Sequence, residues 1–319
     1  MTKISLSILI NFIAAAILCP LFIPLLKSLK ARQSILEIGP NWHMGKSGTP
    51  TMGGIVFIVT IVMSTLFFVR DNATILVILA AVCFGFIGFF DDYIKIINKR
   101  NLGFSARAKF ILQALVAIVF IAALRILGIV NDVVYFPFLK NGLNFGFFYI
   151  PIMVFIALAS VNSVNLTDGI DGLASSVTVI VSLFLTAAAM MLKLSSMGII
   201  AGAIIGALLG FLIYNFHPAK VFMGDTGSLF LGGLMIMISI VQKTPVFFIV
   251  AGAIYFIETI SVIIQVTAYK LTGKRVFKMS PIHHHFEMTG YSEVKIVTVF
   301  CVVTLILSIF CFFALSFSI

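Results

Sequence analysis

Charged residues are scarce in this chain of 319 residues. Only 10% of its residues are Asp, Glu, Lys or Arg, whereas 61% are hydrophobic and the mean hydropathy is +1.20. Soluble globular domains carry charge on about a quarter of their residues. The composition therefore excludes a soluble globule and predicts a polytopic membrane protein.

Cysteine is also rare, and its placement excludes two common uses. The chain contains no Cys-x-x-Cys pair, and its four cysteines lie inside apolar runs, at Cys19, Cys83, Cys301 and Cys311. Zinc sites and disulfide frameworks need other spacings. We expect these side chains to act as small hydrophobic residues without disulfide bonds.

Long apolar runs dominate what is present. A transmembrane helix needs about 20 apolar residues, and ten segments approach that length: 4–26, 51–69, 73–90, 108–127, 147–164, 173–192, 196–214, 227–241, 245–268 and 294–317. The first lacks a signal-peptide cleavage pattern, so we expect a retained span. With no internal repeat or linker, we predict an all-α polytopic membrane protein, residues 1–319 forming one domain of about ten transmembrane helices.

Positive charge is distributed unevenly between the two sides of these spans. Five loops fall on one side, at 27–50, 91–107, 165–172, 215–226 and 269–293, opposite both termini. Of the 21 Lys and Arg residues, 15 lie nearer to the five-loop side and six to the other. Since cytoplasmic loops are enriched in these residues, we expect the five loops in the cytoplasm and both termini outside. The net charge of +10 then reflects orientation and anionic lipid, with no nucleic-acid partner.

Eight of the 11 acids share the five-loop side, although acids contribute little to orientation. The stretch Asn165-Leu-Thr-Asp168-Gly-Ile-Asp171-Gly places two carboxylates and an amide directly behind an apolar run. At about 100° per residue these three side chains fall within about 120° of a helix, so they can face one cleft. Acids at a bilayer rim are functional candidates; the alternative is a solvated loop.

Two further acidic motifs lie at predicted helix ends. Asp91 and Asp92 close the third span and point about 100° apart, towards different partners. Asp225 lies between glycines at the start of the eighth span, where the backbone can approach a ligand closely. Its carboxylate is a hard oxygen ligand of the kind that Mg²⁺ takes. The alternatives are a solvated acid pair at a helix end and, for Asp225, a helix N-cap.

Basic residues accompany the acids. Lys95 and Lys99 follow at helical spacing, where they either hold phosphate or serve as ordinary inside-positive charges. Gly45-Lys46-Ser47 matches the end of a P-loop, but that motif needs glycine where the chain has Pro40. The nucleotide P-loop reading therefore fails, while Lys46 still places a cation at the mouth of the second span.

Three histidines follow a predicted helix start. Ser280 is expected to cap this helix, with Pro281 at its first position and His283, His284 and His285 in its first turn. Such a turn suits phosphate. Because three consecutive side chains span about 200°, they cannot all contact one ligand, and we expect one or two to face a phosphate.

Two other features lie outside these motifs. Asn141-Gly142 separates two aromatic, β-prone runs between Asp132 and Tyr149, which predicts a small extracytoplasmic β-hairpin with a type I′ turn. Glu258 lies within the ninth apolar segment, where a buried acid has either a structural or a functional role.

Five motifs together resemble a known family. They are Pro50-Thr51-Met52-Gly53-Gly54, Asp91-Asp92, the run from Asn165 to Gly172, Gly224-Asp225-Thr226-Gly227-Ser228 and Pro281-Ile282-His283-His284-His285. In this order, and across nearly the whole chain, they resemble the phospho-N-acetylmuramoyl-pentapeptide transferase branch of the polyprenyl-phosphate N-acetylhexosamine-1-phosphate transferase family. One departure is Tyr291, where the family is expected to have Trp.

The resemblance implies a ten-helix protein of the bacterial cytoplasmic membrane, usually a homodimer. It implies a cytoplasmic-face cleft and a bent ninth helix that forms a groove for lipid. The implied reaction moves phospho-MurNAc-pentapeptide from UDP-MurNAc-pentapeptide onto undecaprenyl phosphate with Mg²⁺, giving lipid I and UMP. The alternative is a polyprenyl-phosphate GlcNAc-1-phosphate transferase, which shares the metal site, although the three histidines favour the muramoyl branch.

The resemblance also implies roles for individual residues. Asp225 would bind the metal with Asn165 nearby, Asp91 would deprotonate or orient the lipid phosphate, and Asp92 would support that site. The nucleoside and phosphate pocket is expected to comprise Lys46, Asp168, Asp171, Asn215 and Phe222, with Phe222 stacking on uracil. Contacts to phosphates or to the sugar-peptide are expected from Lys95, Lys99, His283, His284 and His285.

A different class, a cation transporter, would use membrane acids as an ion pathway. That function predicts acids spread along the helices at mid-membrane depth. Apart from Glu258, the acids of this chain lie outside the predicted spans, eight of the 11 on the five-loop side. The distribution therefore favours an enzyme with its site at one face.

Overall fold

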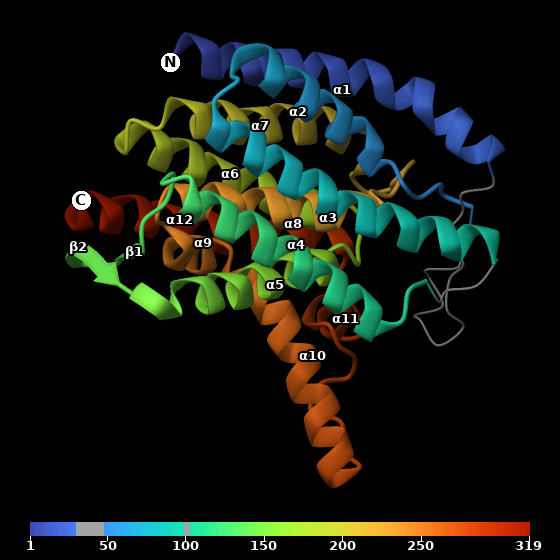
Figure 1. Ribbon diagram of the computed structural model, residues 1–319. Helices are drawn as coiled ribbons and strands as arrows, with labels where there is room; N and C mark the ends of the chain where they lie inside the picture. The colour runs from blue at the N-terminus through green and yellow to red at the C-terminus, as the bar shows by residue number, and fades with distance from the viewer. Residues whose placement is uncertain (30–47, 99–102) are drawn as a thin grey trace.

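The computed structural model describes residues 1–29, 48–98 and 103–319, which form a bundle of helices and one small sheet (Figure 1). The longer helices are α1 (Thr2–Ser28), α2 (Gly54–Phe68), α3 (Asn72–Ile97), α4 (Ala106–Ile126), α5 (Tyr149–Thr167), α6 (Leu173–Met191), α7 (Ser195–Asn215), α8 (Gly224–Val241), α10 (Ala253–Thr272) and α12 (Glu293–Ser318). The shorter elements are β1 (Val133–Phe136), β2 (Leu139–Asn144), the 3₁₀ turn η2 (Gly146–Phe148), α9 (Pro245–Ala251) and α11 (Ile282–Glu287).

Nine of the described helices are long and apolar enough to cross a membrane. The remaining predicted span, residues 51–69, corresponds to α2, an apolar helix of only 15 residues. The all-α polytopic class is thus confirmed. All four cysteines are free, as expected.

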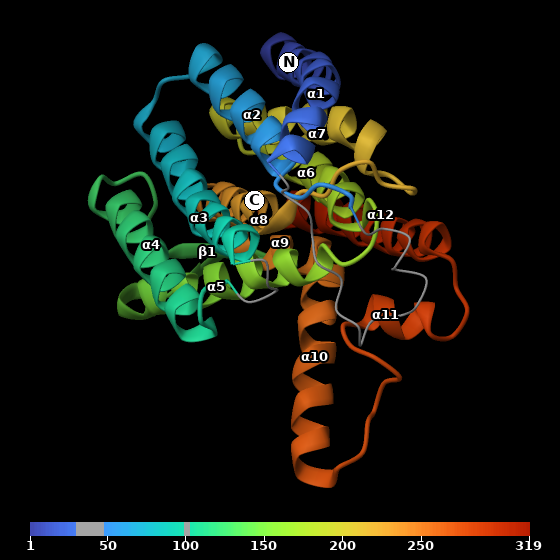
Figure 2. The same ribbon diagram turned by 90° about the vertical axis from the view of Figure 1, so that its right-hand side faces the viewer.

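The ninth predicted span, residues 245–268, is broken rather than continuous. Helix α9 ends and α10 begins at Gly252, whose conformation is not helical. Helix α10 projects away from the other helices in both views (Figures 1 and 2). Its buried residues lie in its first two-thirds: Ile254, Tyr255, Glu258, Ser261 and Gln265. A bend in this helix was implied by the resemblance and is present.

The predicted hairpin exists, but its turn was placed wrongly. Strands β1 and β2 pair antiparallel, and Phe136 faces Leu139, so the connecting residues are Pro137 and Phe138. Asn141 and Gly142 lie instead within β2, both at positive φ, where the register shifts. Their left-handed conformations accommodate a bulge rather than a type I′ turn, because extra residues in one strand need backbone angles outside the β region.

Glycine brings α3 and α8 into close contact. A Cβ at Gly88 would lie 2.1 Å from the carbonyl oxygen of Asp225, and one at Gly233 would lie 2.4 Å from the Phe84 ring. Small residues let helix backbones approach closely inside membranes. This contact sets the last turns of α3, which carry two acids, against the first turn of α8.

The two ends of the bundle differ in character. Both termini and the hairpin lie at one end, on the left of Figure 1. At the other end, loops that are distant in sequence meet: Phe222 hydrogen-bonds Pro50, Asp91 lies beside Asp225, and Asp171 lies beside His217 and Glu293. Residues of the five predicted loops thus share one end of the molecule, which confirms that part of the topology for the described residues.

Candidate functional site

The loop before α8 is held by the segment before α2. Phe222 donates its N–H to the carbonyl of Pro50 at 2.9 Å, and Gly53 donates to the carbonyl of Phe222 at 2.8 Å. Gly54 and Gly227 touch so closely that a Cβ on Gly54 would lie 2.4 Å from the Gly227 Cα. The Pro50–Gly54 motif therefore acts as a scaffold for the start of α8.

Asp92 caps α8 from another helix. Its Oδ1 accepts the N–H of Asp225 at 3.2 Å, and its Oδ2 accepts the N–H and hydroxyl of Thr226 at 2.9 and 2.7 Å. The first amides of a helix need such partners. Helix α3 continues to Ile97, so Asp92 lies inside that helix and does not close it, which corrects the predicted end. The capping residue of α8 by position is Met223, so Asp225 is not its N-cap.

Asp225 is surrounded by polar groups from three other helices. The Nζ atoms of Lys95 (α3) and Lys109 (α4) each lie 2.8 Å from its Oδ2. Asn165, at the end of α5, donates its amide nitrogen to Oδ1 at 2.8 Å and to the hydroxyl of Ser228 at 2.8 Å. The carboxylate is therefore fixed on both sides.

Asp91 completes the acidic cluster. Its Oδ2 lies 2.6 Å from Lys95 and 3.9 Å from Lys109, while its Oδ1 accepts the N–H of Phe104 at 2.8 Å. Asp91 and Asp92 thus contact different partners, as their spacing predicted. Carboxylate oxygens of Asp91, Asp92 and Asp225 all lie within 4.8 Å of one another.

Asp168 lies beside this cluster, in the turn that ends α5. Burial, together with the negative charges of Asp225, Asp92 and Asp171, raises the pKa of its carboxyl to about 8. The neighbouring acids therefore favour a protonated Asp168 at neutral pH. The predicted convergence of Asp91 and Asp225 is confirmed, and Asp168 lies near enough to interact with the charge of Asp225.

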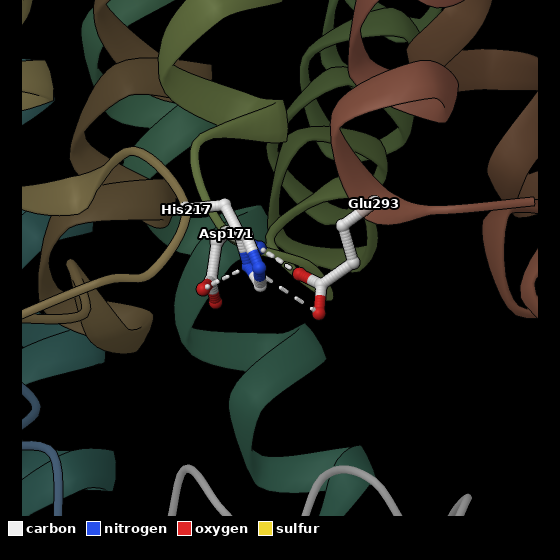
Figure 3. A group of neighbouring side chains, drawn as sticks. All are labelled: Asp171, His217 and Glu293. Carbon is white, nitrogen blue, oxygen red and sulfur yellow. Dashed lines mark hydrogen bonds and ion pairs between the residues drawn. The ribbon is translucent and has the colours of Figure 1, made fainter.

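Asp171 belongs to a second cluster, with His217 and Glu293 (Figure 3). Its Oδ2 lies 3.1 Å from His217 Nδ1 and accepts the N–H of Ala219 at 2.9 Å. Its own N–H donates to Glu293 Oε2 at 3.0 Å. This cluster joins the 165–172 loop, the turn after α7 and the first turn of α12.

Asn215 ends α7, and Phe222 lies in the turn between α7 and α8. The amide of Asn215 is buried, donating to the carbonyl of Val221 at 3.0 Å and accepting the hydroxyl of Ser175 at 2.8 Å. Asn215 therefore braces the turn that presents Phe222, whose ring is half-buried.

The three histidines point to three different partners. His283 Nδ1 lies 3.1 Å from Glu258, His284 Nδ1 lies 2.6 Å from Glu287, and His285 Nδ1 accepts the N–H of Lys278 at 3.1 Å. The prediction that they cannot all contact one ligand stays a prediction, and their separate partners agree with it. Helix α11 begins at Ile282, one residue later than predicted, so Pro281 and not Ser280 is its N-cap.

Sequence reasoning missed several partners of these acids. Lys109 was counted only as an inside-positive charge, although its place in the first turn of α4, on the side of the acids, was a usable signal. His217 and Glu293 carried no motif of their own. Two predicted site residues, Lys46 and Lys99, lie outside the described residues.

The cluster as a whole combines hard anionic oxygens with two lysines and an amide. Carboxylates of this kind suit a divalent cation such as Mg²⁺. Phosphoryl transfer relies on positioning and on neutralising phosphate charge, which needs cations beside the metal ligands. The geometry therefore suits a reaction between phosphate-bearing substrates.

Comparisons with known proteins agree with this chemistry. The glycosyl transferase family 4 model matches residues 74–243, and a phospho-N-acetylmuramoyl-pentapeptide-transferase signature matches residues 46–58. Proteins named phospho-N-acetylmuramoyl-pentapeptide-transferase are similar along the whole chain. The one from Clostridium botulinum (strain Alaska E43 / Type E3) is 51% identical over 97% of this chain and 95% of its own. Those from Thermoanaerobacter sp. (strain X514) and Caldicellulosiruptor bescii are 48% and 46% identical, over 98% of this chain and 99% and 96% of their own.

Proposed function

The chain belongs to the phospho-N-acetylmuramoyl-pentapeptide transferase family, and we propose that it transfers phospho-MurNAc-pentapeptide from UDP-MurNAc-pentapeptide to undecaprenyl phosphate. The products are lipid I and UMP, as in peptidoglycan synthesis. One observation carries the proposal: Asp91, Asp92 and Asp225 gather with Asn165, Lys95 and Lys109 at one end of the bundle.

Magnesium fits this donor set. Three carboxylates with oxygens within 4.8 Å of one another carry more negative charge than two lysines neutralise, and they are hard ligands. Asp225 and Asp91 would hold the ion. Asn165 turns its amide nitrogen to Asp225 in this arrangement, so its predicted role as a ligand stays a prediction. The bound ion would supply charge neutralisation between the two phosphate-bearing substrates.

The chain's own residues perform the remaining tasks. Lys95 and Lys109 place cations where phosphate oxygens need them. Asp91 would orient the lipid phosphate or accept its proton. Asp92 keeps Asp225 in position by capping α8.

The donor would lie towards the 165–172 and 215–223 turns. Asp168 and the half-buried ring of Phe222 would contact its nucleoside and phosphates, whereas Asn215 and Asp171 brace the two turns. Predicted contacts from Lys46, Lys99, His284 and His285 belong to the same proposal, whereas the His283 ring is fully buried.

We favour direct attack. An oxygen of the lipid phosphate forms a bond to the phosphorus that carries the sugar, the pyrophosphate bond breaks, and UMP leaves. Asp225 is needed for the cation and is bonded by two lysines and an amide, so it is poorly placed as a nucleophile. A ³²P-labelled protein intermediate that is absent from Asp225→Asn would overturn direct attack.

The protein is a multi-pass bacterial membrane protein. Its orientation, with both termini outside and the site in the cytoplasm, its homodimeric state and its single-domain organisation are proposed from the charge distribution and the family. Labelling of cysteines introduced into the hairpin and into α11 of intact cells would test the orientation.

The test of the proposed function is UMP release by the purified protein. Undecaprenyl phosphate and Mg²⁺ are supplied with either UDP-MurNAc-pentapeptide or UDP-GlcNAc. The proposal predicts turnover with the first donor and little with the second. Turnover with UDP-GlcNAc alone would assign the other branch of the family.

A further inference from the structure

Glu258 and His283 form a buried pair between two helices. Both side chains are 0% exposed, Glu258 on α10 and His283 at the start of α11. Glu258 Oε2 lies 3.1 Å from His283 Nδ1 and accepts the His283 backbone N–H at 3.4 Å. One carboxylate thus holds the backbone of His283 by a hydrogen bond and lies against its ring, whose two nitrogens make no hydrogen bond within the described residues.

The other edge of the His283 ring lies against the 165–172 loop. A Cβ added at Gly169 would lie 2.2 Å from His283 Nε2 and 2.5 Å from Cε1. The φ angle of Gly169 is outside the left-handed region, so its backbone does not require glycine. Glycine is required there because of the His283 imidazole, which leaves no space for a Cβ atom on residue 169.

This contact reaches the acidic cluster through one residue. Gly169 follows Asp168, whose carboxyl interacts with the charges of Asp225 and Asp92. Asn165, four residues before Gly169, holds Asp225 itself. A shift of the loop would therefore move groups on both sides of the site.

The geometry of His283 does not favour a direct contact with substrate. The ring is fully buried, and its edges face Glu258 and Gly169. Catalytic geometry is sensitive to misplacement, and a shift of 1 Å can cost about 100-fold in rate. The pair is therefore suited to hold the loop in place.

We propose that Glu258 and His283 are positioning residues: the carboxylate orients the ring, and the ring sets the 165–172 loop through Gly169. The proposal rests on the proposed function only in assigning this loop to the UDP-sugar. It gives Glu258, an acid inside an otherwise apolar helix, a role in placing the donor.

The kinetic test uses five variants in the UMP-release assay: Glu258→Ala, Glu258→Gln, Gly169→Ala, His283→Ala and the double variant Gly169→Ala with His283→Ala. Glu258→Ala and Gly169→Ala should raise KM for the UDP donor about tenfold or more, with KM for undecaprenyl phosphate changed less than about twofold. Glu258→Gln should restore most of the loss, because its amide oxygen can still accept the backbone N–H of His283.

The double variant separates positioning from a direct contact. Removing the ring opens the space that the new methyl group needs. The double variant should therefore have the same kinetics as His283→Ala alone, and a smaller loss than Gly169→Ala shows. Strictly additive losses, wild-type kinetics in Gly169→Ala, or equal changes in both KM values would overturn the proposal.

A measurement without turnover separates this proposal from the proposed function. In hydrogen exchange of the full chain, peptides covering 165–172 should exchange about fivefold faster in Glu258→Ala than in Glu258→Gln, with the hairpin peptide 139–144 unchanged. That result would support the positioning role even if the wild-type protein released no UMP, an outcome that would reject the reaction alone. Equal exchange of the loop in the two variants would reject the positioning role.

Discussion

Asp92 on α3 accepts two hydrogen bonds from Thr226 on α8, at 2.9 Å from the backbone N–H and 2.7 Å from the hydroxyl. Both residues are buried, 4% and 2% exposed. An acid from one helix therefore caps another, and the capped turn is the one that carries Asp225. The contact is therefore expected to affect both the stability of the fold and the position of Asp225.

Replacing Asp92 by Ala should destabilise the protein and slow the reaction together. Loss of a helix cap costs roughly 0.5–2 kcal/mol, which corresponds to a fall of a few degrees in the melting temperature. Turnover should also fall, because Asp225 moves with its helix turn. Thermal unfolding in detergent and UMP release measure the two effects.

Asp71 provides a matched control for this prediction. It caps α3 by accepting the N–H of Thr74 at 2.7 Å, at the start of that helix and away from the acidic cluster. Asp71→Ala should lower the melting temperature comparably and leave turnover near normal at temperatures where the protein is folded. Loss of turnover in Asp92→Ala with an unchanged melting temperature would show that Asp92 acts in the chemistry and not as a cap.

Lys109 is predicted to be as important as Lys95. Each lies 2.8 Å from Asp225 Oδ2. Lys109→Met keeps most of the side-chain volume and removes the cation, so kcat/KM should fall at least about tenfold, as expected where phosphate charge is left unneutralised.

The control for Lys109 is Lys140→Met, an exposed lysine of β2 at the opposite end of the bundle. It should retain wild-type kinetics. If Lys109→Met also retains them, the contact between Lys109 and Asp225 serves only to hold the acids in the absence of substrate.

The convergence of the acids was predictable because their motifs carry local signals. Asp91 and Asp225 lie at span ends on the same side, and Asn165 follows an apolar run, so topology alone gathers them. The partners of these residues were not predictable in this way. Contacts such as Lys109 with Asp225, or Glu258 with His283, depend on how helices distant in sequence pack together.

Local details failed for identifiable physical reasons. The hairpin was located by Asn141-Gly142, but these positive-φ residues form a bulge, and the chain turns at Pro137 and Phe138 instead. The ninth span reads as one apolar run because hydropathy does not record that the helix breaks at Gly252. Likewise, α3 extends past its apolar stretch because Asp91 and Asp92 find partners on α8 and beyond.

The raised pKa of Asp168 predicts a pH dependence of stability. The pKa of its carboxyl is about 8 in the native protein and ordinarily 3.8. Between these values the native state keeps a proton that the unfolded state has lost, so stability falls as pH rises towards 8 and levels off above it. One proton contributes at most about 1.4 kcal/mol per pH unit, and solvent at this half-buried site reduces the effect.

Melting temperatures at pH 6 and pH 8, in detergent with EDTA, measure this dependence. The wild-type protein should lose more stability over this interval than Asp168→Asn, which has no carboxyl to ionise. An identical fall in both proteins would show that other groups cause it and that the pKa of Asp168 is not raised.

The central claim is that Asp91 and Asp225 hold one divalent cation at the shared end of the helices. Titration of the purified protein with Mn²⁺, followed by the electron paramagnetic resonance signal of the free ion, tests it without turnover. Asp132→Asn serves as the control, because Asp132 pairs with Arg125 at 2.7 Å beside the hairpin, at the other end of the bundle. The account predicts one site in the wild-type protein and in the control, weaker binding in Asp91→Asn and none in Asp225→Asn. Full Mn²⁺ binding by Asp225→Asn would contradict it.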